Sequence, residues 1–205
     1  MTRKGTAAAT NEHWIAEGRA GYFADFGVYA VLLAVLIAVG ASGRTGSPRN
    51  WLVAAAVGAA VWTLIEYGLQ RFVFQKVPAI AAIHLVHHRR PCSYLWTPTW
   101  LSLTILAGLF LAPLWRWASP PTALGAVSGI VGGYLWYGIE RHVIHHGRPR
   151  WLALRLRNAG RRHALHHGSG NSGNFGVRSA IWDVAFGTVL SDREQQPNRE
   201  STVEP

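Results

Sequence analysis

The sequence is short of several residue types, and each shortage excludes a class of protein. Its 205 residues include one cysteine, Cys92, so no internal disulfide can form and a disulfide-stapled fold is excluded. Charged residues make up 15% of the chain and apolar residues 49%, which excludes an intrinsically disordered protein. We expect Cys92 to be a small buried apolar residue.

Acidic residues are also scarce. Ten Asp and Glu stand against twenty Lys and Arg, so the formal net charge is +10. Such a charge favours an anionic partner, either phospholipid or nucleic acid. The chain carries no nucleic-acid-binding motif, whereas arginines next to membrane spans are drawn to anionic lipids. We therefore expect a membrane, and no nucleic acid, as the partner.

The apolar residues are gathered into long runs rather than spread along amphipathic stripes. A helix needs about 20 mostly apolar residues to cross a bilayer. Four runs are predicted to do so: Phe26–Ser42, Trp51–Leu69, Leu101–Trp117 and Thr122–Ile139. The predicted fold class is all-α, an integral membrane bundle of about four transmembrane helices.

The distribution of positive charge predicts the orientation and the domain limits. With four spans, the N-terminus, residues 70–100 and the residues after Glu140 share one side, and they carry most of the Arg and Lys. The positive-inside rule makes that side cytoplasmic, and the arginine-rich composition indicates a bacterial inner membrane. We predict an N-terminal cytoplasmic tail (1–21), a membrane domain (22–190) and a disordered C-terminal tail (191–205).

Nine of the ten histidines form three copies of one spacing, His-x-x-His-His, of which chance would give roughly 0.02 per chain. On a helix, positions i, i+3 and i+4 share one face, and imidazole is the commonest metal ligand. All three copies lie on the predicted cytoplasmic side, so they can meet in a histidine-rich helical cap. The predicted metal ligands are His84, His87, His88, His142, His145, His146, His163, His166 and His167.

The number of histidines exceeds what one ion can bind in its first shell of four to six ligands. Two metal ions, or one ion surrounded by further histidines, would use them. Imidazole suits iron, zinc, copper and nickel alike, so the histidines by themselves choose neither the metal nor the reaction.

Longer stretches around the triplets carry a resemblance to a known family. These are residues 62–75 (WTLIEYGLQRFVFQ), Tyr137 ahead of the second triplet, and residues 174–188, which begin NFGVRS and end FGT. Together with the triplets they resemble the fatty acid hydroxylase/sterol desaturase superfamily, and the resemblance runs from about Trp62 to Val189.

The resemblance implies a fold, a cofactor and a reaction. Members are integral membrane enzymes that hold two metals with histidines alone and use O₂ and two electrons to hydroxylate or desaturate lipid chains. It implies two metal ions here, expected to be iron with zinc as an alternative after purification, O₂ as co-substrate and a fatty-acyl or other hydrophobic substrate. The triplet histidines other than His142 match its ligand motifs.

The electron donor is expected to be a separate protein, such as a ferredoxin, a cytochrome or a flavin reductase. The chain itself has neither a haem-attachment cysteine pair nor a nucleotide-binding glycine motif.

The chain departs from the family pattern at three positions. Fatty acid hydroxylases have histidines where this chain has Gln70 and Gln75, and their second histidine box begins where this chain has Arg141. Because glutamine is a weaker ligand, the departures leave open whether one or two metals bind.

Three further residues are candidates for catalysis: Glu66, Tyr137 and Asp183. Tyr137 is implied by the resemblance. Carboxylates such as Glu66 and Asp183, with Glu140, could offset the charge of a metal centre or orient the N–H groups of its ligands. Alternatively, Glu66 could simply pair with Arg71 at the edge of the bilayer.

Two other function classes remain open. A zinc-type centre could polarise water and hydrolyse a lipid ester or amide, and dependence on O₂ and reductant would separate this from an oxygenase. A histidine-rich membrane protein could also bind or transport metal without catalysis. Transport requires polar groups inside the spans, and the first, third and fourth spans have few, which disfavours it.

Overall fold

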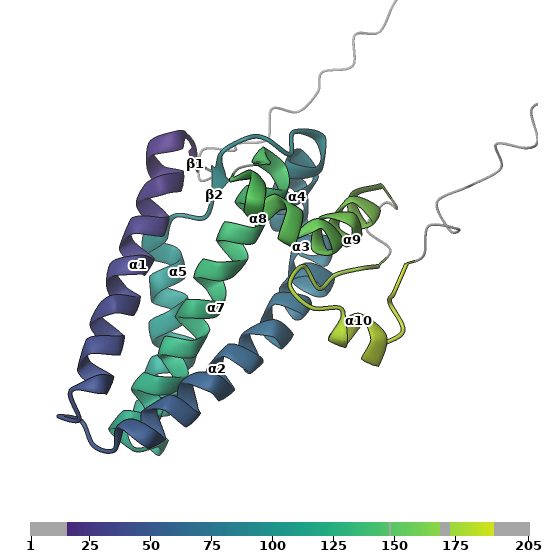
Figure 1. Cartoon of the computed structure of the whole chain (residues 1–205). Helices are drawn as coiled ribbons and strands as arrows, with labels where there is room; N and C mark the ends of the chain where they lie inside the picture. The colour runs from purple at the N-terminus through teal and green to yellow at the C-terminus, as the bar shows by residue number, and fades with distance from the viewer. Residues whose placement is uncertain (1–15, 148, 169–172, 191–205) are drawn as a thin grey trace, which may run out of the picture.

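The computed structural model describes residues 16–147, 149–168 and 173–190, so the predicted C-terminal tail and most of the predicted N-terminal tail lie outside the described residues. Four long helical stretches make up the bundle (Figure 1). They are α1 (Arg19–Ala41); α2 (Pro48–Gly68) with η1 (Leu69–Val73) and α3 (Phe74–Lys76); α5 (Thr99–Ile105) with η2 (Leu106–Leu111) and α6 (Ala112–Trp117); and α7 (Pro120–His146).

All four predicted spans are confirmed by length and composition. The helices that are long and apolar enough to cross a membrane are Arg19–Ala41, Pro48–Lys76, Thr99–Trp117 and Pro120–His146. Three of them contain the whole predicted run, and the first contains all of its run except the last residue, Ser42; each starts before its predicted run. The chain is therefore an integral membrane protein with an all-α bundle.

The first span begins seven residues before its predicted start because its one carboxylate is satisfied inside the bundle. Asp25 is buried, and it accepts hydrogen bonds from the Tyr134 hydroxyl at 2.7 Å and from the Thr99 hydroxyl at 2.8 Å. A paired polar group can lie inside a helical bundle where an unpaired one would be costly. Asp25 therefore joins three spans.

Shorter helices collect beyond one end of the bundle. Figure 1 shows α4, α8 and α9 near the end where α1 begins and α7 stops, with α10 beside α2. Their bounds are α4 (Pro78–Arg89), α8 (Arg150–Arg155), α9 (Arg157–Gly168) and α10 (Ile181–Ala185). Two strands of two residues, β1 (Ala16–Glu17) and β2 (Leu95–Trp96), pair antiparallel at the same end.

The contact between α2 and α7 depends on small residues. A Cβ atom added at Gly58 would collide with the backbone carbonyl of Ala126, and one added at Gly129 would collide with that of Ala55. Glycines at such points let two helix backbones approach closely, as is common in membrane bundles. This close packing holds the end of α7, and the histidines there, in a defined position relative to α2.

We expect Gly58→Ala to destabilise the bundle by about 1–3 kcal/mol, because the carbonyl it meets belongs to the backbone and cannot rotate away. Thermal unfolding in detergent would measure the loss. Gly68→Ala is the matched control on the same helix, since a Cβ there meets nothing within 4 Å. Equal melting temperatures for the two variants would contradict the close contact.

Candidate metal centre

Seven histidines from three helices meet in two adjacent groups. In group A the possible ligand atoms all lie within 4.8 Å of one another, and the same holds in group B. Group A consists of His87, His145, His163 and His167, and group B consists of His84, His88 and His166. The rings of His88 and His167 stack at 3.9 Å between centroids, so the two groups lie side by side.

The spacing of the histidines and the ends of three helices place these side chains. Helix α4 starts with Pro78 in its first turn, and the spacing of its triplet puts all three histidines on one face. Helix α7 ends at Gly147, whose φ of 66° is the left-handed conformation that glycine adopts readily, just after the second triplet. Helix α9 carries the third triplet in its last turns. Group A thus draws on three helices and group B on two.

The spacing of the nitrogen atoms fits ligands around a common ion. The Nε2 atoms of His145 and His163 are 3.0 Å apart, and those of His163 and His167 are 2.9 Å apart. In group B the Nε2 atoms of His84 and His88 are also 2.9 Å apart. Ligands at about 2.1 Å from a metal and roughly at right angles would lie about 3 Å from each other.

Burial keeps these imidazoles in the neutral form that binds metals. Loss of hydration lowers the pKa of His84 to about 3, of His88 to about 4 and of His167 to about 3. The same cause lowers the pKa of His87 and His163, and the Arg141 guanidinium is the next contribution at His87. The lone pairs are therefore available at neutral pH.

Two histidines of the second triplet lie outside both groups, contrary to the prediction that all nine converge. His142 is contacted by the Tyr22 hydroxyl at 3.2 Å from its Nδ1, and His146 stacks on Tyr94 at 4.9 Å. A hollow of about 710 Å³ between α1 and α7 is lined by His142 with Phe23. His142 and His146 stack on each other at 4.5 Å and lie against these tyrosines, whereas His145, in line with Tyr137 and Arg141, contacts the other histidines.

Asp183 anchors the loop that follows the third triplet, of which the structure describes residues 173–180. It is fully buried, and its carboxylate accepts hydrogen bonds from the backbone N–H groups of Phe175 (2.8 Å) and Gly176 (2.9 Å) and from the Thr188 hydroxyl (2.8 Å). It lies outside the two histidine groups. Asp183 therefore binds the backbone of this loop directly.

Glu66 holds the same loop from α2. Its Oε1 accepts hydrogen bonds from the backbone N–H groups of Val177 at 2.8 Å and Arg178 at 3.0 Å. Arg71, the alternative partner considered for Glu66, instead donates to the Tyr67 hydroxyl at 2.6 Å. Glu66 thus connects the second span to the chain beyond α9.

Tyr137 is hydrogen-bonded to Gln70, one of the positions where the chain lacks a histidine of the family pattern. Its hydroxyl accepts a hydrogen bond at 3.1 Å from the Nε2 of Gln70, which is buried in the π-helical turn η1. Short π-helical turns are frequent at functional sites. Arg141 and His145 follow Tyr137 at intervals of one turn on α7, so the three share a face.

The loop also orients one histidine, a feature that the sequence did not reveal. The Nδ1–H of His166 donates to the carbonyl of Gly173 at 2.8 Å, which leaves the Nε2 lone pair for a metal. Arg162 steadies the loop by donating to the Val177 carbonyl at 3.2 Å. A histidine followed closely by glycines and asparagines was the available signal, but it did not specify this bond.

The prediction that Cys92 is buried is wrong. It is exposed rather than buried, and its thiol contacts the carbonyl of His145 at 3.3 Å. Its position close to α7 follows from the chain passing from α4 to β2 beside the end of that helix.

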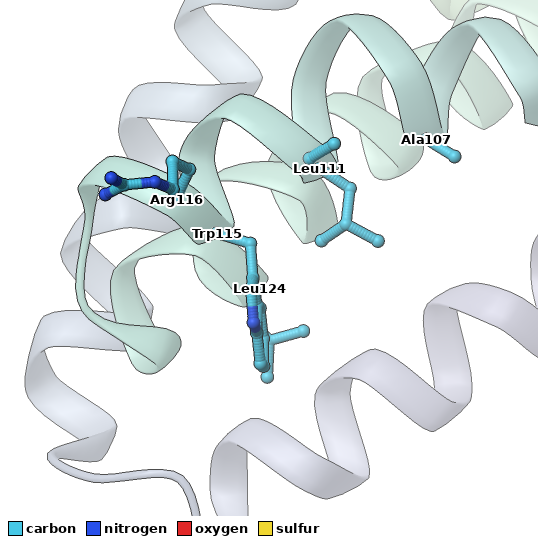
Figure 2. Close-up of a pocket in the computed structure, with 6 residues that line it drawn as sticks. Ala107, Leu111, Trp115, Arg116 and Leu124 are labelled. Carbon is cyan, nitrogen blue, oxygen red and sulfur yellow. The ribbon is translucent and has the colours of Figure 1, made fainter.

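A further hollow lies far from the histidines. It measures about 670 Å³, and Figure 2 shows lining residues such as Leu111, Trp115 and Leu124. Leu124 precedes His145 on α7 by about 30 Å of helix. This apolar groove on the third span is therefore separate from the metal centre.

Comparisons with known proteins agree on one family. A family model described as fatty acid hydroxylase matches residues 55–188. The chain is 29% identical over 176 residues to a dihydroceramide fatty acyl 2-hydroxylase of Arabidopsis thaliana, covering 79% of this chain and 70% of that protein. It is 33% identical to a ceramide very long chain fatty acid hydroxylase of Saccharomyces cerevisiae, covering 65% of this chain and 37% of that protein.

A solved structure shows the same fold. The structure of full-length Scs7p, in which only the hydroxylase domain is visible, matches with a TM-score of 0.68 and 26% identity. The match covers 83% of this chain and 67% of that one.

Proposed function

The chain belongs to the fatty acid hydroxylase family, and from this premise we propose that it hydroxylates a fatty-acyl chain or another hydrophobic lipid. The reaction would use O₂ and electrons from a separate donor, such as a ferredoxin, a cytochrome or a flavin reductase. The relatives named for fatty acyl and ceramide substrates support a lipid as the substrate class.

The observation that carries the proposal is the pair of adjacent histidine groups. Group A would hold one ion with four imidazoles and group B a second with three. Two such ions, which we propose to be iron, would supply the O₂-dependent oxidation of C–H bonds that side chains cannot perform. The neutral, closely spaced Nε2 atoms support this donor set.

The other candidate residues would position the metal ligands and line the centre. Glu66 and Asp183 would keep the loop after α9 in place, and the loop would hold His166 through Gly173. Such outer contacts fix the tautomer and direction of a ligand. Tyr137, tied to Gln70, would line the side of the centre that faces the spans.

The smaller number of histidines in group B points to an asymmetric centre. The Oε1 of Gln70 is buried with no hydrogen-bond partner among the described residues. This amide oxygen could supply a weak further contact, and we expect the ion in group B to be the more readily lost of the two.

We place the histidine-rich cap on the cytoplasmic side of a bacterial inner membrane. The positive-inside rule supports this orientation, because the cap contains most of the arginines. We also propose that residues 22–190 form the membrane domain and that the segment before it (1–21) is cytoplasmic.

The test is oxygen-dependent turnover. Iron-loaded protein in lipid vesicles, given a reductant system and a fatty-acyl lipid, is expected to yield a product heavier by one oxygen atom in mass spectrometry. The product should disappear under nitrogen or without reductant. Release of a free acid that continues under nitrogen would contradict the proposal and favour a zinc-type hydrolase.

A further inference from the structure

Residues 181–189, which follow the loop, are apolar on their exposed face although they lie beyond the last predicted span. Between Arg178 and Leu190 the only ionisable residue is Asp183, which is fully buried. On α10 the outward side chains Ile181 and Val184 are 61% and 69% exposed, and Phe186 and Val189 are also more than half exposed. A water-facing surface would rarely gather four large apolar side chains on so short a segment.

The segment lies beside the middle of the second span. The Trp182 indole N–H donates to the Thr63 hydroxyl at 2.9 Å, and the Phe186 ring stacks on Tyr67 at 5.3 Å. Thr63 lies about 22 Å along the helix from Pro48, near the centre of the Pro48–Lys76 span. Figure 1 shows α10 next to α2.

The exposed face continues a surface that already faces lipid. On α2, Val57, Val61 and Leu64 are exposed on either side of Thr63, and a spanning helix directs such residues at acyl chains. The apolar side chains of α10 therefore extend this surface sideways.

The backbone of the segment is paired as an apolar environment requires. The N–H groups of Val184, Phe186 and Thr188 donate to the carbonyls of Ala180 (2.8 Å), Trp182 (2.9 Å) and Asp183 (2.8 Å). An unpaired N–H group in hydrocarbon costs several kcal/mol. The segment can thus lie in lipid without exposing these polar groups.

We propose that residues 181–189 are inserted into the bilayer, where they contact lipid acyl chains beside the middle of α2. The chain would then re-enter the membrane after the histidine-rich cap. This inference does not depend on the reaction proposed above.

The insertion would tie the metal centre to the membrane. The N–H of Asn174 donates to the carbonyl of Thr188 at 2.8 Å, which joins the start of the loop to the inserted segment. Gly173, next to Asn174, accepts the hydrogen bond from His166. Lipid contact would hold this ligand, and hence group B, close to the hydrocarbon from which a lipid substrate arrives.

The test is fluorescence quenching in phosphatidylcholine vesicles. In a Cys92→Ser background, Val184→Cys carries an environment-sensitive dye, with Val61→Cys as the lipid-facing reference and Ala164→Cys, on the exposed side of α9, as the water-facing control. Lipids with a nitroxide on the acyl chain should quench the Val184 dye as strongly as the Val61 dye, and at least threefold more than the Ala164 dye. Aqueous iodide should give the reverse order.

Iodide quenching of the Val184 dye equal to that of the Ala164 dye, with no effect of nitroxide lipids, would overturn the proposal. Ile181→Cys provides a second labelling position on the same face, so one poorly folded variant would not decide the result. None of these measurements requires turnover, and a failed hydroxylation assay would leave them unaffected.

Discussion

Replacing His87 with alanine is expected to abolish the metal binding proposed for group A and to lower hydroxylation by at least about a hundredfold. Losing even an outer-shell partner of a metal ligand costs 10–100-fold. His87 is buried, and neither ring nitrogen has a hydrogen-bond partner among the described residues. Its ring lies 4.7 Å from that of His145 and 5.2 Å from that of His167. No other described imidazole occupies this position between α7 and α9.

Metal analysis of the purified protein and product formation would measure the effect together. His142→Ala is the matched control, because His142 has the same residue type and lies on α7 but contacts Tyr22 rather than either group. It should keep the wild-type metal content. Equal metal loss in both variants would show that the centre is arranged differently from the two groups described above.

Replacing Asp183 with alanine is expected to cost about 3 kcal/mol or more of unfolding free energy, since it leaves buried donors without an acceptor. Three donors would lose their partner: the N–H groups of Phe175 and Gly176 and the hydroxyl of Thr188. For a chain of this size that loss corresponds to roughly 6–12 °C in melting temperature. Because the loop holds His166, we also expect weaker metal binding by group B.

Thermal unfolding in detergent and metal titration would measure the two effects of Asp183→Ala. Ser179→Ala is the control in the same segment, since its hydroxyl accepts only an exposed hydrogen bond from the N–H of Ile181 at 3.2 Å. It should change stability by less than about 1 kcal/mol. If Asp183→Ala had the same melting temperature as the control and bound metal normally, the result would contradict the role of the loop in positioning His166.

Features that depend on neighbours in the chain could be predicted from sequence. The apolar runs predicted the four spans, since crossing a bilayer needs only length and composition. The triplet spacing predicted that the histidines of α4 and of α9 would share a face. The first span was predicted to start seven residues too late, because no local pattern shows that Asp25 accepts hydrogen bonds from Tyr134 and Thr99.

Sequence by itself thus established a four-span helical bundle and three histidine triplets on one side of it, because periodicity and hydrophobicity are local properties of a chain. The tertiary structure determined that seven of the nine histidines meet in two groups, that His142 and His146 turn away, and that Asp183 and Glu66 bind loop backbone. Those outcomes depend on how helices far apart in the chain are rotated and packed against each other. A helix rotated by one residue turns its side chains by about 100°, and no pattern within a single helix specifies that rotation.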